Sequence, residues 1–216
     1  MKNLYTILLS TGLFLLCSSC DKLKDDPSVL GGDQSPIGDV GATLESSSVE
    51  IFGVSDFSAS VIALKSGISS CSGQVTLKNE ILKSLVANIP GVTINENIVT
   101  VSNLELKLSI EGIELKTGPS AGIWVKYSSS VGDTYPIGTT GEVRKVVSKS
   151  DTDDYPYGFM MIKTIQVEET PKVLKSAGVI KITYIANHKF GLVGVKINFD
   201  DGTSVIFPLY SSGQNG

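Results

Sequence analysis

The residues best suited to acid–base or nucleophilic chemistry are few and widely separated in this sequence. His188 is the only histidine. A hydrolase triad would need it beside a nucleophile and a carboxylate, but it is expected in a turn between two strands, and no serine has the G-x-S-x-G context of a nucleophile elbow. The glycines form neither G-x-G-x-x-G nor a phosphate-binding loop. These patterns predict a protein that is not an enzyme and that uses no cofactor.

Carboxylates are concentrated at one place, Asp151-Thr152-Asp153-Asp154. Oxygen ligands at short spacing suit Ca²⁺, but an EF-hand loop needs Gly at its sixth position and Glu at its twelfth, which here are Pro156 and Ile162. A zinc site would need several His or Cys ligands. The sequence therefore predicts no metal site, and a solvated loop is the favoured interpretation of these aspartates.

Two tyrosines follow the acidic loop, and flat rings of this kind can stack on sugars. Pro156 holds its neighbours extended, so both rings could be displayed at the surface. The resulting hypothesis is a ligand-binding surface for a glycan or a protein partner. It consists of Tyr155, Tyr157, Asp151, Asp153 and Asp154.

The N-terminus has the composition of a secretory signal peptide. Lys2 precedes a mostly apolar run from Leu4 to Leu16, which is 13 residues long. A membrane-spanning helix needs roughly 20 residues. A short apolar run behind one positive charge is typical of a signal peptide, and we expect it to cover residues 1–19.

The segment Leu16-Cys17-Ser18-Ser19-Cys20 resembles the bacterial lipobox, in which an apolar or small residue and two small residues precede a cysteine. The resemblance implies cleavage before Cys20 and attachment of a diacylglycerol to its sulfur. Cys17 fits the pattern poorly as the acceptor, because Leu16 directly precedes it. Two or more acyl chains give stable membrane anchoring, so the membrane is the expected partner.

The charged residues after Cys20 resemble two different sorting signals of bacterial lipoproteins, which predict different locations. Asp21 resembles the inner-membrane retention signal of enteric bacterial lipoproteins. The cluster Lys24-Asp25-Asp26 resembles the surface-export signal of Bacteroidota lipoproteins. We favour the second, because the cluster is the more specific element. The expectation is an outer-membrane lipoprotein exposed at the cell surface, and the alternative is the periplasmic face of a membrane.

The length and charge of the chain limit the number of domains it can form and the partners it can bind. Without residues 1–19, 197 residues remain, enough for one large all-β domain or two small ones. The formal net charge is −4, with lysines and carboxylates interspersed, and nucleic-acid binding is excluded because phosphate contacts need clustered cations. With Cys17 removed and Cys20 lipidated, Cys71 has no disulfide partner in the chain and is expected to be a small buried hydrophobe.

Residues 20–40 are rich in turn formers, among them Pro27, Gly31-Gly32 and Pro36. We expect them to be a lipidated, flexible tether that lifts the folded part off the membrane.

Strand patterns begin at about residue 40. Residues 104–111 alternate, so that Leu104, Leu106, Leu108 and Ile110 share one face. Residues 179–185, 192–199 and 203–210 predict a C-terminal meander, with Asp200-Asp201-Gly202 as a hairpin turn. Pro208 favours an edge position or a strand end. Apolar residues at helical spacing predict one short helix over 77–89, stopped by Pro90-Gly91.

These elements predict an all-β fold, an antiparallel β-sandwich of immunoglobulin-like or related type. It forms either one domain or two lobes, residues 41–118 with the helix and residues 119–216 with the meander. The predicted function is a lipid-anchored extracytoplasmic protein with a non-enzymatic binding or structural role. The alternatives are a surface glycan-binding accessory protein and a fimbrial or adhesin-like subunit that associates by strand exchange.

Overall fold

The computed structural model describes residues 29–46, 50–87, 91–118, 120–170 and 178–213. The expected signal peptide, Cys20 and the charged cluster that follows it lie outside these ranges. Within them the chain is all-β with one α-helix, as predicted. No helix in the described ranges is long and apolar enough to span a membrane.

The strands are β1 (Thr43–Ser46), β2 (Val54–Lys65), β3 (Ile68–Leu77), β4 (Val92–Asn95), β5 (Ile98–Ser109), β6 (Gly112–Leu115), β7 (Gly122–Lys126), β8 (Thr134–Ile137), β9 (Glu142–Lys149), β10 (Tyr155–Tyr157), β11 (Met160–Ile162), β12 (Ile165–Glu169), β13 (Val179–Asn187), β14 (Gly191–Phe199) and β15 (Ser204–Ser212). Thirteen of them form one sheet in the order β7-β6-β5-β3-β2-β1-β15-β14-β13-β12-β9-β8, with β4 added beside β5. Strands β10 and β11 form a separate hairpin. Every pairing is antiparallel, which confirms the predicted all-β, antiparallel class.

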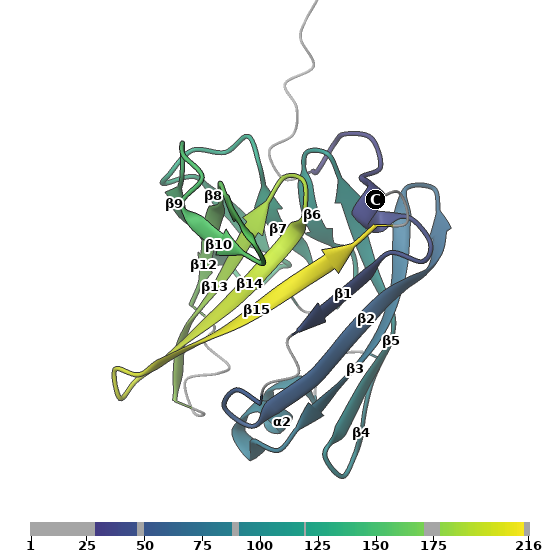
Figure 1. Ribbon diagram of the computed structural model, residues 1–216, viewed down its shortest axis with the longest axis vertical. Helices are drawn as coiled ribbons and strands as arrows, with labels where there is room; N and C mark the ends of the chain where they lie inside the picture. Colours follow the sequence, from purple (N-terminus) through teal and green to yellow (C-terminus); the bar gives the residue numbers. More distant parts are fainter. Residues whose placement is uncertain (1–28, 47–49, 88–90, 119, 171–177, 214–216) are drawn as a thin grey trace, which may run out of the picture.

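The first and last strands of this order, β7 and β8, lie beside each other. The sheet therefore curls into a nearly closed, barrel-like layer (Figure 1). Next to β7 and β8, the N–H of Gly138 donates to the carbonyl oxygen of Ala121 at 2.8 Å. Gly122 has φ +124°, and a Cβ there would come within 2.7 Å of the carbonyl oxygen of Pro136. Glycine at this position therefore allows the close approach of the two end strands.

The two halves of the sequence form the two halves of the sheet. Strands β1 to β7 lie together, strands β8, β9 and β12 to β15 lie together, and β1 pairs with β15 to join them. The expected boundary near residues 117–119 falls between β6 and β7, which are hydrogen-bonded neighbours. One continuous sheet therefore runs through both of the lobes that the sequence suggested.

The single helix, α2 (Glu80–Val86), lies near the end of the sheet opposite to η1 (Pro36–Gly38) (Figure 1). Asn79 caps it, since its Oδ1 accepts a hydrogen bond from the N–H of Leu82 at 3.1 Å. The predicted range of 77–89 was too long at its start, because Leu77 ends β3. Ile89 and Pro90 lie outside the described residues.

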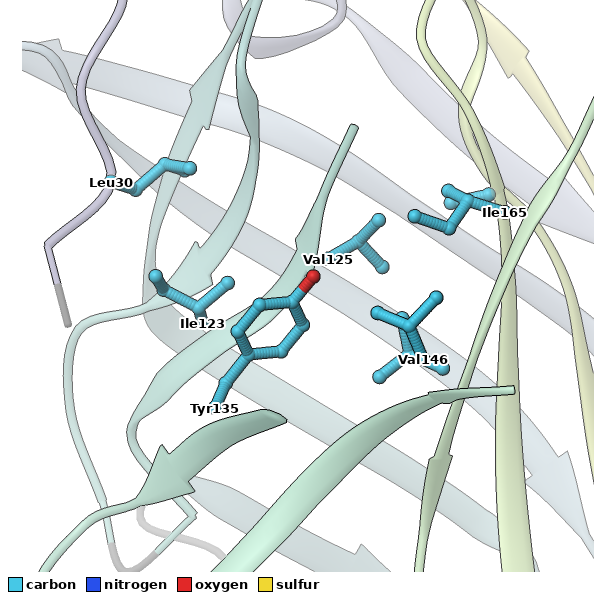
Figure 2. Packing of buried hydrophobic residues seen from close by; sticks show 8 residues of the cluster. Leu30, Ile123, Val125, Tyr135, Val146 and Ile165 are labelled. Carbon is cyan, nitrogen blue, oxygen red and sulfur yellow. The ribbon is translucent and has the colours of Figure 1, made fainter. Parts of the chain in front are cut away.

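The flexible tether predicted for residues 20–40 is wrong for residues 29–40. The side chain of Leu30 is fully buried and packs in one cluster with Ile123 and Tyr135 (Figure 2). The N–H of Ser35 donates to the carbonyl oxygen of Leu108 at 3.0 Å. Turn-forming residues here allow the segment to follow the end of the sheet closely, rather than leaving it free in solvent.

The strand-level predictions are confirmed in the meander and partly confirmed in β5. Asp200-Asp201-Gly202 forms the turn between β14 and β15. Ile110 does not continue the apolar face of β5, because the chain reverses there and its side chain is 57% exposed. The edge position or strand end expected for Pro208 is wrong, because Pro208 lies inside β15 opposite Gly194 of β14, just beyond the Leu209 end of the ladder with β1. It is tolerated because the ladder with β1 needs no N–H from it.

Candidate functional site

The curled sheet forms the wall of a cavity of about 400 Å³ that is partly open to solvent. This volume lies within the roughly 300–1,000 Å³ of small-molecule sites in proteins. Its wall comes from η1 and from strands of both halves of the sheet. The apolar residues that contribute to it are Ile37, Ala42, Leu44, Val54, Phe57, Ala59, Val61, Cys71, Val75, Val101, Leu104, Leu106, Leu108, Ile113, Trp124, Phe190, Leu192, Val195, Phe207 and Leu209.

The wall is apolar because the strands alternate their side chains between the two faces of the sheet. In β5, Leu104, Leu106 and Leu108 line the cavity, while Glu105 between them is exposed. In β15, Phe207 and Leu209 line it in the same way. Both strands therefore contribute an apolar row to the interior.

Two groups of side chains limit the cavity. Ile37 of η1 packs against the buried cluster of Ala42, Val61, Cys71, Leu108 and Ile113. Toward α2, Val54 and Val75 belong both to the cavity wall and to the cluster around Leu77, Leu82 and Val99. The cavity is thus the unfilled middle of the interior, between two regions of packed side chains.

Trp124 forms the part of the wall that faces the second half of the sheet. Its ring stacks on Tyr184 of β13, with centroids 5.3 Å apart and an interplanar angle of 8°. The guanidinium carbon of Arg144 lies 5.9 Å from the centroid of the Tyr184 ring. Tyr184 therefore links this part of the wall to the buried charge of Arg144.

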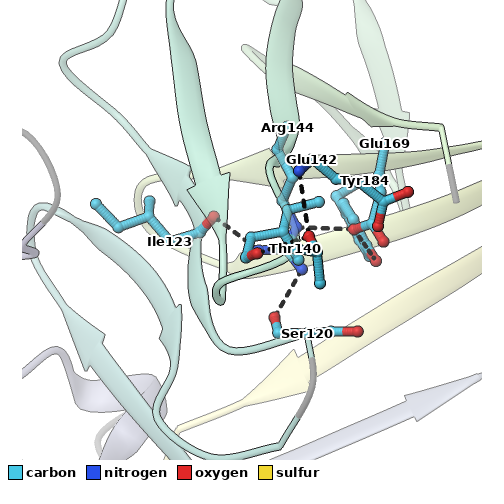
Figure 3. A network of polar contacts seen from close by, with 8 residues as sticks. Ser120, Ile123, Thr140, Glu142, Arg144, Glu169 and Tyr184 are labelled. Carbon is cyan, nitrogen blue, oxygen red and sulfur yellow. Dashed lines mark hydrogen bonds and ion pairs between the residues drawn. The ribbon is translucent and has the colours of Figure 1, made fainter.

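Arg144 is the centre of a buried polar network (Figure 3). Its side chain is fully buried, and its Nε donates to Glu169 Oε2 at 2.8 Å. Its other nitrogens donate to the carbonyl oxygens of Ile123, at 3.2 Å, and Ser120, at 2.8 Å. Tyr184 also donates to Glu169 Oε2, at 3.2 Å, and burial raises the pKa of this phenol. The network joins β9, β12 and β13 to the segment that leads into β7.

Cys71 lies in the cavity wall and is the free cysteine of the described residues. It is buried, as expected, and burial raises the pKa of its thiol to about 11. Removal from water disfavours the charged thiolate. The thiol is therefore protonated at neutral pH and acts as a small apolar group in the wall.

The structure places the predicted ligand-binding tyrosines in a hairpin that covers the outer face of the sheet. Tyr157, predicted to be displayed, is instead buried at 8% exposure. Its phenol oxygen accepts a hydrogen bond from the N–H of Ser211 at 3.0 Å, and its ring packs on Phe190 and Tyr210. Tyr155 is half-buried and lies over Gly194. The exposed apolar residues of this hairpin are Phe159 at its tip and Met160 and Met161 of β11.

The acidic residues of this region remain at the surface. Asp151, Asp153 and Asp154 are all exposed, and the described residues contain no group of three or more His, Cys, Asp or Glu side chains that could hold a metal ion. His188 is exposed in the turn between β13 and β14. Neither part of the chain contributes to the cavity wall.

The sequence patterns do not indicate the cavity. Apolar residues within 104–108 and 192–199 do line it. Their alternation in the sequence, however, predicts only that one face of each strand is buried. Whether such a face meets another side chain or an empty volume depends on how the sheet curls. Comparisons with protein-family models, with curated proteins and with solved structures found no match.

Proposed function

We propose that this chain is an exported, lipid-anchored protein that binds a small apolar molecule in the cavity of its sheet and does no chemistry on it. The observation that carries the proposal is a cavity of about 400 Å³ whose described lining contains no Asp, Glu, Lys, Arg or His. Burial of apolar surface contributes about 25 cal/mol per Å². An apolar ligand would gain this free energy while filling space that the side chains leave empty.

The remaining expectations for the chain form part of the same proposal. Cys20 would carry the lipid, and the favoured location is the outer membrane at the cell surface, with the periplasmic face of a membrane as the alternative. The two halves of the sheet, β1 to β7 on one side and β8, β9 and β12 to β15 on the other, would act as the facing layers of the predicted antiparallel sandwich. The ligand would lie between these layers.

Two observations favour this function over its alternatives. A glycan platform needs exposed rings, whereas Tyr157 is buried and hydrogen-bonded to Ser211. An adhesin that exchanges strands needs a long accessible sheet edge, whereas the end strands β7 and β8 lie beside each other and the edge strand β4 has only four residues. Neither observation affects an apolar ligand held inside the sheet.

The test uses Trp124, which is the only tryptophan of the chain and lies in the cavity wall. The mature chain with Cys20→Ser would be titrated with N-phenyl-1-naphthylamine, a neutral fluorescent probe. We expect saturable binding, accompanied by energy transfer from Trp124 to the probe. A chain that binds no probe would contradict the proposal.

A matched pair of variants locates the probe. Ala59 and Ala63 lie on β2, but Ala59 lines the cavity and Ala63 is exposed. Ala59→Phe fills part of the cavity and should weaken probe binding at least about tenfold. Ala63→Phe should leave it unchanged. Equal binding by both variants would place the probe elsewhere on the protein.

A further inference from the structure

We infer that the ligand of this cavity is uncharged along its whole buried length, as a fatty alcohol, a neutral acylglycerol or an isoprenoid alcohol is, and that free fatty acids and alkyl amines are rejected. The inference rests on the proposed function and names its ligand class. It follows from where the protein places, and does not place, polar groups around the cavity.

The wall offers no charge to pair with an ionised ligand. The polar groups among its described residues are the hydroxyls of Thr43, Ser46, Ser60, Ser72 and Ser211 and the buried indole N–H of Trp124, and none of these carries a charge. The Trp124 N–H has no hydrogen-bond partner among the described residues. The Ser211 hydroxyl already donates to the carbonyl oxygen of Phe190 at 2.8 Å. An ammonium or carboxylate group in the cavity would therefore lose its water and gain no counter-charge.

The raised pKa of Cys71 shows that a negative charge in the cavity wall is unfavourable. Its thiol ionises only at about pH 11, because burial disfavours the thiolate. A carboxylate placed against the same wall would meet the same penalty. A hydroxyl or ester would not, since it needs only hydrogen bonds and carries no net charge.

The nearest buried charges cannot supply the missing counter-ion. Arg144 and Glu169 form an ion pair of zero net charge, and neither residue lines the cavity. The guanidinium nitrogens donate to Glu169 and to two backbone carbonyl oxygens. A ligand anion that took Arg144 as its partner would have to break this pair.

The test compares three ligands with the same alkyl chain and different end groups: 1-dodecanol, dodecanoate and dodecylammonium. Each would be used below its micellar concentration to displace N-phenyl-1-naphthylamine from the mature Cys20→Ser chain at pH 8. We expect dodecanol to bind at least about tenfold more tightly than either ion. We also expect the affinity for dodecanoate to rise as the pH falls toward the pKa of the acid, while that for dodecanol stays constant.

The outcomes separate this inference from the proposed function. Binding of dodecanoate or dodecylammonium as tight as that of dodecanol, with the same loss in Ala59→Phe, would overturn the inference and leave an apolar cavity site. A chain that binds neither the probe nor dodecanol would overturn both. Preference for dodecanol that Ala59→Phe abolishes and Ala63→Phe retains would support both.

Discussion

At the scale of single residues, Tyr157 illustrates how a polar tip determines where an aromatic ring can lie. Its ring is buried between Phe190 and Tyr210, while its oxygen accepts a hydrogen bond from the N–H of Ser211. A buried tyrosine needs such a partner, because an unsatisfied polar group in the interior costs free energy. This partner is 54 residues away in the chain, so no local pattern could indicate it.

Tyr157→Phe should lower the free energy of unfolding by about 1–3 kcal/mol, since it leaves the N–H of Ser211 without its acceptor. Urea denaturation followed by circular dichroism measures the change. Phe159→Leu in the same hairpin is the control and should change stability by less than about 0.5 kcal/mol, because Phe159 is fully exposed. The reverse order of effects would show that Tyr157, not Phe159, faces solvent.

Cys71 provides a second prediction at this scale, on its reactivity. Its pKa of about 11, against the ordinary 9.0, leaves about a hundredfold less thiolate at neutral pH than an ordinary cysteine has. Alkylation by iodoacetamide should therefore be slow at pH 7.5 and rise about tenfold per pH unit through pH 10. The urea-unfolded chain is the control. A folded-state rate that levels off near pH 9 would mean that Cys71 is in contact with water.

At the scale of elements, β12 separates two neighbouring glutamates by the alternation of its side chains. Glu169 is buried and pairs with Arg144 at 2.8 Å. Glu168 points the other way and pairs with Lys181, whose side chain is 45% exposed. The same residue type at adjacent positions thus makes one buried and one solvated ion pair.

Glu169→Gln should destabilise the fold by about 3–5 kcal/mol, because it leaves the charge of Arg144 buried and unpaired. Glu168→Gln should cost less than about 1 kcal/mol, since an exposed pair is screened by water. Urea denaturation of the two variants gives both values. Similar costs for the two substitutions would contradict the buried network.

The segment of residues 29–40 acts as an element of the fold without being a strand. Leu30→Ala should cost about 2–5 kcal/mol, because it opens a cavity in the cluster with Ile123 and Tyr135. Val29 is 54% exposed, so Val29→Ala should change stability by less than about 0.5 kcal/mol. Thermal unfolding of both variants tests this. An unaffected Leu30→Ala variant would restore the interpretation of this segment as a tether.

The elements that the sequence predicted best are those with local signals. The turn at residues 200–202 and the alternation of residues 104–108 depend only on neighbours in the chain, and both are found in the structure. The helix start was placed too early because apolar spacing cannot tell the end of β3 from the first turn of α2. Leu30 was missed because its partners lie about 90 or more residues away along the chain.

At the scale of the whole molecule, closure of the sheet depends on contacts with no sequence signal. Strand β1 pairs with β15, so that Leu44 lies opposite Ser211. The two end strands of the sheet, β7 and β8, lie beside each other. These pairings decide that the apolar faces of both halves line one cavity. The sequence could therefore indicate which residues face inward, but not that the space between them is left unfilled.

The last prediction concerns how the whole molecule is held at its membrane. If Cys20 carries the lipid, Cys20→Ser should remove the lipid mass. Treatment with globomycin, which blocks the cleavage step after lipid attachment, should instead leave a lipidated precursor that retains residues 1–19. Thermal stability and probe binding should not change, because the cavity wall lies between residues 37 and 211. Cys17→Ser is the matched control and should leave lipidation intact, since that residue is expected in the cleaved peptide. A Cys20→Ser protein that still carries lipid, or a Cys17→Ser protein that loses it, would place the anchor elsewhere.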